Sequence, residues 1–256
     1  MVIREQAEHF IMIEQHEHAR LSGEIAKHLK SEYFIHEKDR QDVIYAITQH
    51  DRGWIRLDAH PIWNEVTNAP YYFVDYPYAV KLKMYQVGIQ EVESVNPYAG
   101  YLVSHHFSTF PDIKNGTDPF SISFNQEEKQ RQDQLEQQLG SIQETEMKQH
   151  YHLLQLCDDL SLYVCMNEPG VSKEKEHPWF QKGLGSAAVL FQEGTESVQA
   201  CWKDEDTVEV QPAPFSKSFE AELSYRKVAK KDIQDKGLNK AYHETKPAVQ
   251  KITYTS

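Results

Sequence analysis

The chain has 256 residues, which is enough for one or two domains and too many for a peptide that needs disulfides to fold. Asp and Glu number 39 and Lys and Arg number 27, so the formal net charge is −12. This balance argues against duplex nucleic acid or an anionic membrane as the main partner, and leaves a small anionic substrate as the expected one. The 13 His residues direct attention to metal binding.

Cysteine usage and hydropathy narrow the class further. The three cysteines, Cys157, Cys165 and Cys201, include no C-x-x-C pair, so neither a zinc ribbon nor a thioredoxin-type motif is indicated. The first residues lack the long apolar stretch of a signal peptide, and the chain has no run of 18 apolar residues. We therefore expect a cytoplasmic protein without a membrane span.

The first half of the chain predicts mostly helices. Residues 2–13 alternate weakly, which is typical of a short strand or a lead-in to the first helix. An irregular, aromatic and proline-bearing segment over residues 52–80 is expected to cover part of the helical body. Helical periodicity predicts helices over residues 14–31, 37–48, 78–93 and 97–108.

The next segments differ sharply in polarity. Residues 109–124 are typical of a loop, and the polar stretch 125–139 predicts a solvated helix or hairpin arm. Residues 144–166 show the strongest helical pattern in the chain. Residues 167–185 indicate a linker or lid.

After residue 185 the period of the apolar residues changes to two. Alternation at 187–191, 208–210 and 219–225 predicts three or four antiparallel strands within 186–228, followed by a charged tail with a short helix. The expected fold is therefore mainly α, a helical bundle with a small C-terminal antiparallel β layer. We expect a helical metal-binding part over 1–185 and a β appendage over 186–256, packed together as one cooperative unit.

Four predicted helices each turn a potential metal ligand toward their apolar face: His18, the pair His50-Asp51, His106 and Asp158. A single inward histidine is usually a hydrogen-bonded core residue, but a charged Asp on an apolar face is costly unless it is paired or binds a metal. Imidazole and carboxylate groups together suit zinc, iron, manganese, cobalt or nickel.

The 3.6-residue period of a helix indicates which member of Asp158-Asp159, and which member of His105-His106, faces the apolar side of its helix. Asp158 lies on the same stripe as Leu154, whereas Asp159 lies on a more polar stripe. His106 likewise falls on the more apolar side of its helix, and His105 does not. We therefore expect Asp158 and His106 to face the site.

The order and spacing of these residues resemble the HD superfamily of metal-dependent phosphohydrolases, and more narrowly an uncharacterised bacterial family of HD-like proteins. The residues that carry the resemblance are Gln15-His18-Ala19-Leu21-Ser22-Gly23, His50-Asp51-Gly53-Trp54 with Asp58 and Pro61, Leu102-Val103-Ser104-His106, and Asp158-Leu160-Ser161-Leu162. The match covers roughly residues 10–165.

The resemblance implies an HD-type helical bundle in which His18, His50, Asp51 and Asp158 bind a divalent transition metal. It also implies hydrolysis of a phosphoester on a nucleotide or small phosphorylated metabolite. In this reading Asp51 aligns the attacking water, and His106 acts as a further ligand or as a general acid.

Two other functions stay open. Some HD-fold proteins hold two irons and use oxygen to cleave a bond, and the chain could instead be a non-catalytic metal- or ligand-binding module. The interval 52–104 contains a single histidine, His60, which favours one metal over two. A homodimer is also compatible with the sequence. Candidates for a second metal or for the substrate are His105, His106, His60, Asp58, Arg52 and Arg56, of which the arginines suit a phosphate or carboxylate.

Overall fold

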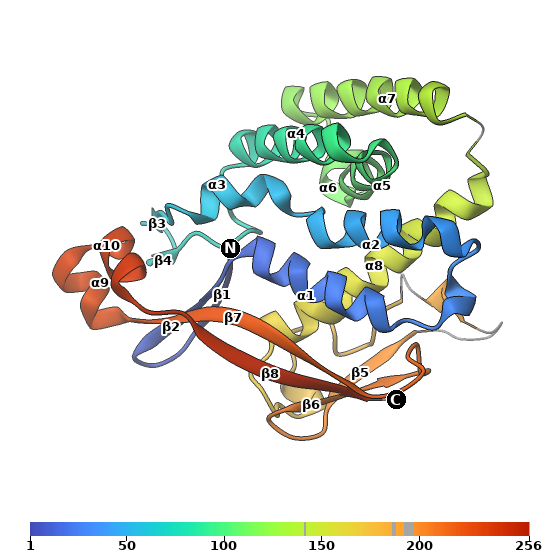
Figure 1. The fold of residues 1–256 in the computed structure, drawn as a ribbon. Helices are drawn as coiled ribbons and strands as arrows, with labels where there is room; N and C mark the ends of the chain where they lie inside the picture. The colour runs from blue at the N-terminus through green and yellow to red at the C-terminus, as the bar shows by residue number, and fades with distance from the viewer. Residues whose placement is uncertain (141, 186–187, 192–196, 256) are drawn as a thin grey trace.

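The computed structural model, which describes residues 1–140, 142–185, 188–191 and 197–255, places a layer of helices against one curved sheet (Figure 1). The helical layer contains α1 (Gln15–His28), α2 (Arg40–Gln49), α3 (Ile55–Asp58), α4 (Tyr78–Val95), α5 (Pro97–Ser108), α6 (Pro111–Lys114), α7 (Pro119–Leu139) and α8 (Glu144–Met166). Helices α1 and α8 contact each other, and both contact strands of the sheet.

The sheet has six strands in the order β1-β2-β7-β8-β6-β5. These are β1 (Val2–Glu5), β2 (His9–Ile13), β7 (Phe219–Ala229), β8 (Ala248–Thr255), β6 (Thr207–Gln211) and β5 (Gln199–Trp202). Neighbouring strands are antiparallel except β6 and β8, which are parallel. The long strand β7 pairs with β8 through Phe219–Tyr225 and with β2 through Arg226–Ala229.

Two smaller units flank this sheet. Strands β3 (Trp63–Asn64) and β4 (Ala69–Pro70) form a separate hairpin within the irregular aromatic segment. Helices α9 (Lys230–Lys236) and α10 (Leu238–Glu244) lie between β7 and β8 in the chain. Leu238 and Tyr242 of α10 pack on Phe10 and Met12 of β2, on the face of the sheet opposite to α1.

The expected mainly α bundle with a small C-terminal antiparallel layer is wrong. The sheet is large and mixed, and it includes β1 and β2 from the N-terminus as well as β8 from the C-terminus. The prediction failed because helical periodicity is visible within a single window, whereas β2 and β7 are more than 200 residues apart and are recognised as partners only when they pair. The division into 1–185 and 186–256 stays a prediction, although strands from both sides of residue 185 share this sheet.

The predicted helices over 14–31, 37–48, 78–93, 97–108 and 144–166 are confirmed as α1, α2, α4, α5 and α8. The predicted loop over 109–124 is wrong in part, because it contains α6 and the first six residues of α7. Asp118 caps α7, since its carboxylate accepts hydrogen bonds from the backbone NH groups of Phe120 and Ser121. The strand expected at 187–191 is also wrong where it is described: residues 188–190 form a 3-10 turn, and Ala187 lies outside the described residues.

Helix α7 is less solvated than its composition suggested. A stripe formed by Ser121, Phe124, Glu128, Gln132 and Leu135 is buried against α5. The carboxylate of Glu128 accepts a hydrogen bond from Ser104 of α5 and one from Arg131. These hydrogen bonds allow a helix with few apolar residues to pack on the body of the protein.

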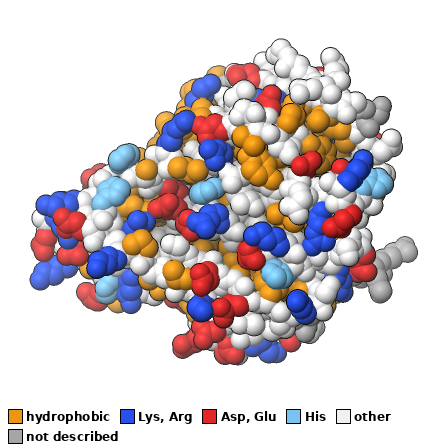
Figure 2. Space-filling model, viewed as in Figure 1, with side chains coloured by type: hydrophobic (Ala, Val, Ile, Leu, Met, Phe, Trp, Pro, Cys, Tyr) orange, Lys and Arg blue, Asp and Glu red, His pale blue; other side chains and the backbone are white. Residues whose placement is uncertain are grey.

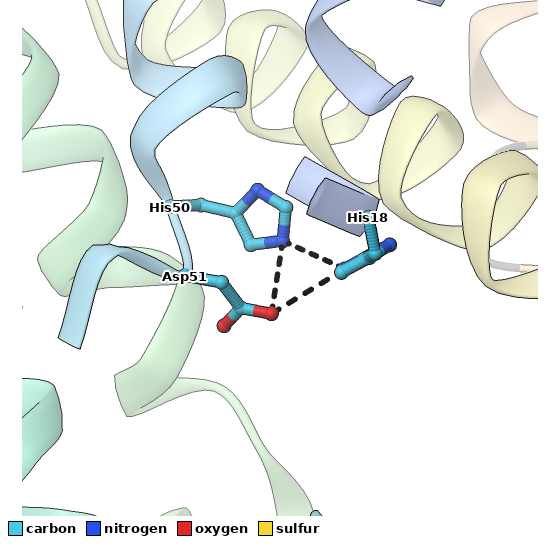
Figure 3. Close-up of side chains that lie close together, drawn as sticks. All are labelled: His18, His50 and Asp51. Carbon is cyan, nitrogen blue, oxygen red and sulfur yellow. Dashed lines mark hydrogen bonds and ion pairs between the residues drawn. The ribbon is translucent and has the colours of Figure 1, made fainter. Parts of the chain in front are cut away.

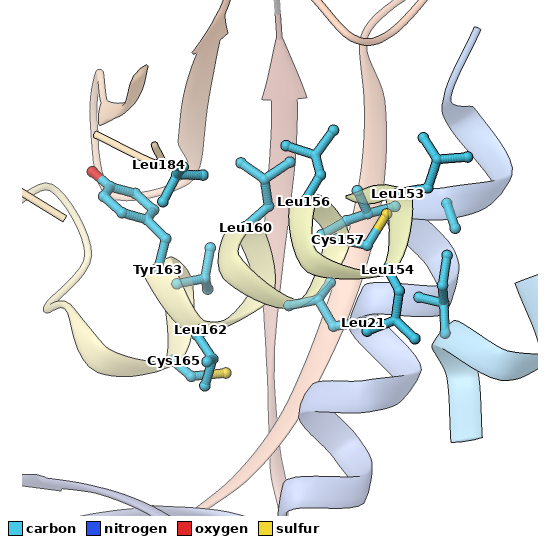
Figure 4. Close-up of a cluster of buried hydrophobic side chains, with 14 of the residues drawn as sticks. Leu21, Leu153, Leu154, Leu156, Cys157, Leu160, Leu162, Tyr163, Cys165 and Leu184 are labelled. Carbon is cyan, nitrogen blue, oxygen red and sulfur yellow. The ribbon is translucent and has the colours of Figure 1, made fainter. Parts of the chain in front are cut away.

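Helix α8 packs beside α1 against the sheet, and its buried side chains share one core with Leu21 of α1 (Figure 4). Its buried residues surround the whole helix axis from Leu153 onward, which is the pattern of a fully enclosed helix. Asp158 and Ser161 are the polar side chains within this buried part of α8. A carboxylate and a hydroxyl at the centre of an apolar core require polar partners.

The surface in Figure 2 carries interspersed positive and negative side chains, densest at the end of the molecule formed by α9 and α10. Among the described residues, no helix combines the length and the apolar character needed to cross a membrane.

Candidate metal centre

Three helices and one turn bring four potential ligands together. His18 lies on α1 and Asp158 on α8, while His50 ends α2 and Asp51 begins the 3-10 turn Arg52–Trp54. The side chains of His18, His50 and Asp51 point toward one another (Figure 3). Burial is nearly complete, since the side chains of both histidines are 1% exposed, that of Asp51 is 7% exposed and that of Asp158 is 12% exposed.

The ligand atoms lie at the spacing of a coordination shell. Nε2 of His18 lies 3.2 Å from Nε2 of His50, 3.4 Å from Oδ2 of Asp51 and 3.1 Å from Oδ1 of Asp158. Nε2 of His50 lies 3.7 Å and 3.4 Å from the same two carboxylate oxygens. Metal–ligand bonds of about 2.1 Å separate neighbouring ligand atoms by about 3.4 Å in a tetrahedral shell and by about 3.0 Å in an octahedral one.

A hydrogen bond to the backbone determines which ring nitrogen of His50 faces the other three candidate ligands. Nδ1 of His50 lies 2.7 Å from the carbonyl oxygen of Ile47. A carbonyl can only accept, so Nδ1 carries the proton of the neutral ring and Nε2 presents a lone pair to the centre. This is the orientation that metal-binding histidines adopt.

A pair of serines acts on His18 in the same way. Oγ of Ser161 lies 2.5 Å from Nδ1 of His18 and 2.7 Å from Oγ of Ser22, whose hydroxyl reaches the backbone oxygen of His18 at 3.1 Å. The Ser161 hydroxyl donates to the backbone oxygen of Asp158 at 3.0 Å, so its oxygen accepts from Nδ1–H of His18. Nε2 of His18 then also presents a lone pair to the centre.

The donor set fits a divalent cation. Two neutral imidazoles and two carboxylates carry a formal charge of −2, and their lone pairs converge within van der Waals distance of one another. Such an arrangement is repulsive without a proton or a cation among the ligand atoms. His18, His50, Asp51 and Asp158 could therefore hold a metal ion, and His106 lies within ligand distance of His50 and Asp158.

The close approach of these charged groups also shifts the pKa values of His50 and Asp158. Burial by itself lowers the pKa of His50, but Asp51 and Asp158 outweigh it and raise that pKa to about 9. Burial also opposes the charge of Asp158, but His50 and His18 hold the pKa of that carboxyl well below its usual range. Without metal, protons thus occupy the position that a cation would take.

His106 borders the centre on α5. Its Nε2 lies 3.6 Å from Oδ2 of Asp158, and its ring centroid lies 5.3 Å from that of His50. Burial lowers its pKa to about 4, so the ring is neutral near pH 7. Its Nδ1 is buried and has no hydrogen-bond partner among the described residues, which distinguishes it from the two histidines whose Nδ1 atoms are held by the protein.

Close backbone packing positions the His-Asp pair. The turn that follows Asp51 lies directly against α4, where a Cβ atom on Gly53 would sit 2.2 Å from the carbonyl oxygen of Met84. A Cβ atom on Gly88 would lie 2.4 Å from the backbone nitrogen of Gly53. Both positions require glycine because the two backbones touch, which gives Gly53 of the His-Asp-x-Gly motif a structural reason.

The model of one protein family covers the four candidate ligands and His106. The model of a family described as "Protein of unknown function (DUF3891)" matches residues 1–230. The chain belongs to the DUF3891 family. No match was found among curated proteins or among solved structures. The matched part of this DUF3891 chain ends at the first residue of α9, so β8 lies beyond it.

The remaining candidates of this DUF3891 chain lie away from the four ligands. Asp58 is buried, pairs with the amino group of Met1 at 2.8 Å and accepts a hydrogen bond from the backbone NH of Gln15. His60 is exposed, and its ring lies 5.9 Å from that of His243. His105 packs on the ring of Tyr101, on another face of α5 from His106.

The two arginines near the His-Asp pair are engaged by a carboxylate of α4. Nε of Arg52 lies 2.8 Å from one oxygen of Glu91, and Nη2 of Arg56 lies 2.6 Å from the other. This arrangement is a partly exposed ion-pair cluster, and among the described residues neither guanidinium forms an ion pair with Asp51 or Asp158.

Three residues that support the candidate ligands were not assigned a role from the sequence. Gln15 donates a hydrogen bond of 3.1 Å from its amide to Oδ2 of Asp51, and Ser22 and Ser161 orient His18. All three stood in the motifs that carry the HD resemblance. Helical spacing offered a further signal, since Ser22 follows His18 by four residues and Ser161 follows Asp158 by three.

Proposed function

We propose that the protein is a metal-dependent phosphohydrolase of the HD type, acting on a phosphoester of a nucleotide or small phosphorylated metabolite. One observation supports it above the rest: two imidazole nitrogens and two carboxylate oxygens from separate elements converge at 3.1–3.7 Å with their lone pairs directed at one point. Among the described residues, no lysine or arginine forms an ion pair with Asp51 or Asp158. The negative charge of these two carboxylates is therefore available to a bound cation.

The proposed cofactor is a divalent transition metal, namely Mn, Fe, Zn, Co or Ni. A mixed set of imidazole and carboxylate ligands favours these ions over calcium and copper(I). When bound, such an ion supplies Lewis-acid chemistry, because it lowers the pKa of a coordinated water and polarises a phosphoryl oxygen.

Side chains of the protein would orient the attacking water and transfer the proton. Asp51 orients the attacking water, and Gln15 holds the Asp51 carboxylate in place through its amide. His106 is assigned the proton transfer, because it lies beside Asp158 and its Nδ1 is not engaged by another described residue. A neutral His106 acts first as a proton acceptor, and an approaching phosphate favours its protonated form.

The positions of the other candidates favour one metal over two. His60, Asp58 and His105 lie away from the centre, which leaves His106 as the nearest addition to the four ligands among the candidates from the sequence. A two-iron oxygenase needs ligands for a second ion. We therefore rank the hydrolase above the oxygenase.

Burial favours a second candidate function, a non-catalytic metal-binding module. The most exposed ligand side chain, Asp158, is only 12% exposed, and closed ligand shells are typical of structural metal sites. A catalytic role requires a small substrate to approach past Asp158 and Asp51.

Metal analysis combined with turnover separates these functions. The protein is purified without chelator, its metals are quantified by mass spectrometry, and phosphate release from a panel of nucleotides and a generic phosphodiester is measured with and without oxygen. One metal per chain and oxygen-independent phosphate release that is lost in His50→Ala, but retained in the exposed control His60→Ala, support the hydrolase.

Other results point elsewhere. Stoichiometric metal without turnover on any substrate of the panel supports the binding module. Two irons per chain with turnover that stops when oxygen is removed contradicts the proposal in favour of the oxygenase. Absence of bound metal after supplementation with each of the five ions rules out all three functions.

A further inference from the structure

The inner face of the sheet, which packs on α1 and α8, changes from apolar to polar toward β1. Register shows which side chains share this face, because residues directly opposite each other in antiparallel strands point the same way. Arg4 pairs with Ile11 and Ile11 pairs with Lys227, which places these three in one row. Gln250 pairs with Leu223, two positions from Tyr225 on β7, so both lie on the same face as Lys227.

Arg4 is the unusual residue of this face. It is 8% exposed, yet it forms no ion pair with a carboxylate among the described residues. Its Nη1 donates to the backbone oxygen of Asn167 at the C-terminus of α8, and its Nε is buried without a hydrogen-bond partner. Burial lowers the pKa of this guanidinium, and the charge of the nearby Glu168 carboxylate offsets this only in part.

A second unpartnered donor lies on the same face. Nε2 of Gln250 is buried and has no hydrogen-bond partner among the described residues. Together with Arg4 it lines an open cavity of about 490 Å³, whose walls also include Tyr225 and Lys227. Buried donors normally find acceptors, so two orphaned donors at one cavity indicate a missing acceptor.

Part of the rim of this cavity is acidic, because Glu168, Glu205 and Asp206 line it. The carboxylate of Glu168 accepts a hydrogen bond from Gln6 and does not pair directly with Arg4. Lys227 and Lys251 also line the cavity, so its lining carries both signs of charge. A ligand that itself carries both signs would match this lining better than a bare phosphate dianion.

We propose that this cavity binds a small zwitterion of the amino-acid type. Its carboxylate accepts hydrogen bonds from Nε of Arg4 and the amide of Gln250, and its ammonium group faces Glu168, Glu205 and Asp206. A guanidinium whose Nη1 is already engaged still offers its Nε edge to a carboxylate. The site is separate from the metal centre, because Asn167 follows Asp158 by nine residues, or about 14 Å along α8.

The test uses the full chain and follows the Nε–H resonances of ¹⁵N-labelled arginine during titration with glycine, acetate and inorganic phosphate at constant ionic strength. Arg4→Lys identifies the Arg4 resonance. We expect a saturable shift of that resonance with glycine, weaker binding of acetate and the weakest binding of phosphate.

Two variants probe the site, and Gln250→Leu leaves in place the hydrogen bond from Arg4 to the C-terminus of α8. Gln250→Leu removes one hydrogen bond and should weaken glycine binding about 3- to 10-fold by calorimetry. The matched controls Gln126→Leu and Arg20→Lys, at exposed positions, should leave binding unchanged. Arg4→Lys should weaken binding by at least about 10-fold, because an ammonium cannot reproduce the Nε edge.

Several outcomes overturn the proposal. No saturable shift of the Arg4 resonance with any of the three probes removes the site. Acetate binding as tightly as glycine contradicts the role of the acidic rim, and phosphate binding most tightly contradicts the ligand class. Unchanged glycine binding in Gln250→Leu contradicts the assigned donor.

Discussion

Ser161 and His18 lie 143 positions apart in the chain, yet the hydroxyl oxygen of Ser161 lies 2.5 Å from Nδ1 of His18. The contact joins α8 to α1 at the candidate metal centre and leaves Nε2 of His18 facing the other candidate ligands. The histidine and its supporting hydroxyl therefore come from the two central helices, so the centre depends on how these helices pack.

Replacement of Ser161 by alanine should weaken metal binding about 10- to 100-fold, the usual effect of removing a group that orients a metal-binding histidine. Competition with a chromophoric chelator measures the affinity. Ser94→Ala is the matched control, since Ser94 is an exposed serine that bonds only to the backbone oxygen of Glu91. Equal affinity of Ser161→Ala and wild type would show that Ser161 does not orient His18.

His50→Ala should leave the protein with less than one metal per chain and remove its stabilisation by added metal. A ligand that binds only the folded state stabilises it by about 2.7 kcal/mol at 100 times its dissociation constant. Thermal unfolding with and without metal, together with elemental analysis, measures both effects. His60→Ala should behave like the wild type, because His60 is exposed and away from the centre. Normal metal content in His50→Ala would exclude His50 as a ligand.

Gly53→Ala should destabilise the protein by about 1–3 kcal/mol, because the added Cβ atom would overlap the carbonyl oxygen of Met84 and push the turn away from α4. The displacement also moves Asp51, so metal content should fall. Urea unfolding and elemental analysis test the two effects. Gly185→Ala is the control, since a Cβ atom there meets no atom of the described residues within 4 Å. A Gly53→Ala protein as stable as the control would contradict the close contact.

His150 should make the protein less stable in mild acid. Burial lowers its pKa to about 4, and the hydroxyl of Tyr98 lies 2.6 Å from its Nδ1. The unfolded chain takes up a proton near pH 6.5 while the folded chain does not, so stability falls as the pH drops from about 6.5 to 4, by at most about 1.4 kcal/mol per pH unit.

The measurement is urea unfolding at several pH values between 4 and 7. His150→Gln should show a shallower loss of stability toward acid than the wild type, and His60→Gln should show the wild-type slope. Parallel curves for His150→Gln and the wild type would indicate that His150 is protonated in the folded protein.

Much of the helical part could be predicted because the information is local. The pattern of Leu154, Leu162 and their neighbours repeats within a few turns, and α8 begins and ends where this pattern predicted, at Glu144 and Met166. The same periodicity directed His18, His50, His106 and Asp158 inward before any neighbour was known. α7 was harder, because Glu128 and Gln132 on its buried stripe look like surface residues until Ser104 of α5 is placed beside them.

The sequence by itself determined the identity of the candidate ligands and the faces of the helices on which they lie, since an α-helix repeats every 3.6 residues whatever its surroundings. Tertiary structure alone decided the rest. Pairing of β2 with β7 and of β6 with β8 joins strands that no local pattern connects. The tautomer of His18 and the cavity at Arg4 likewise depend on contacts between distant segments. Hydrogen-bond partners and strand neighbours are properties of the folded chain, because loop closure brings together residues whose separation in sequence carries no periodic signal.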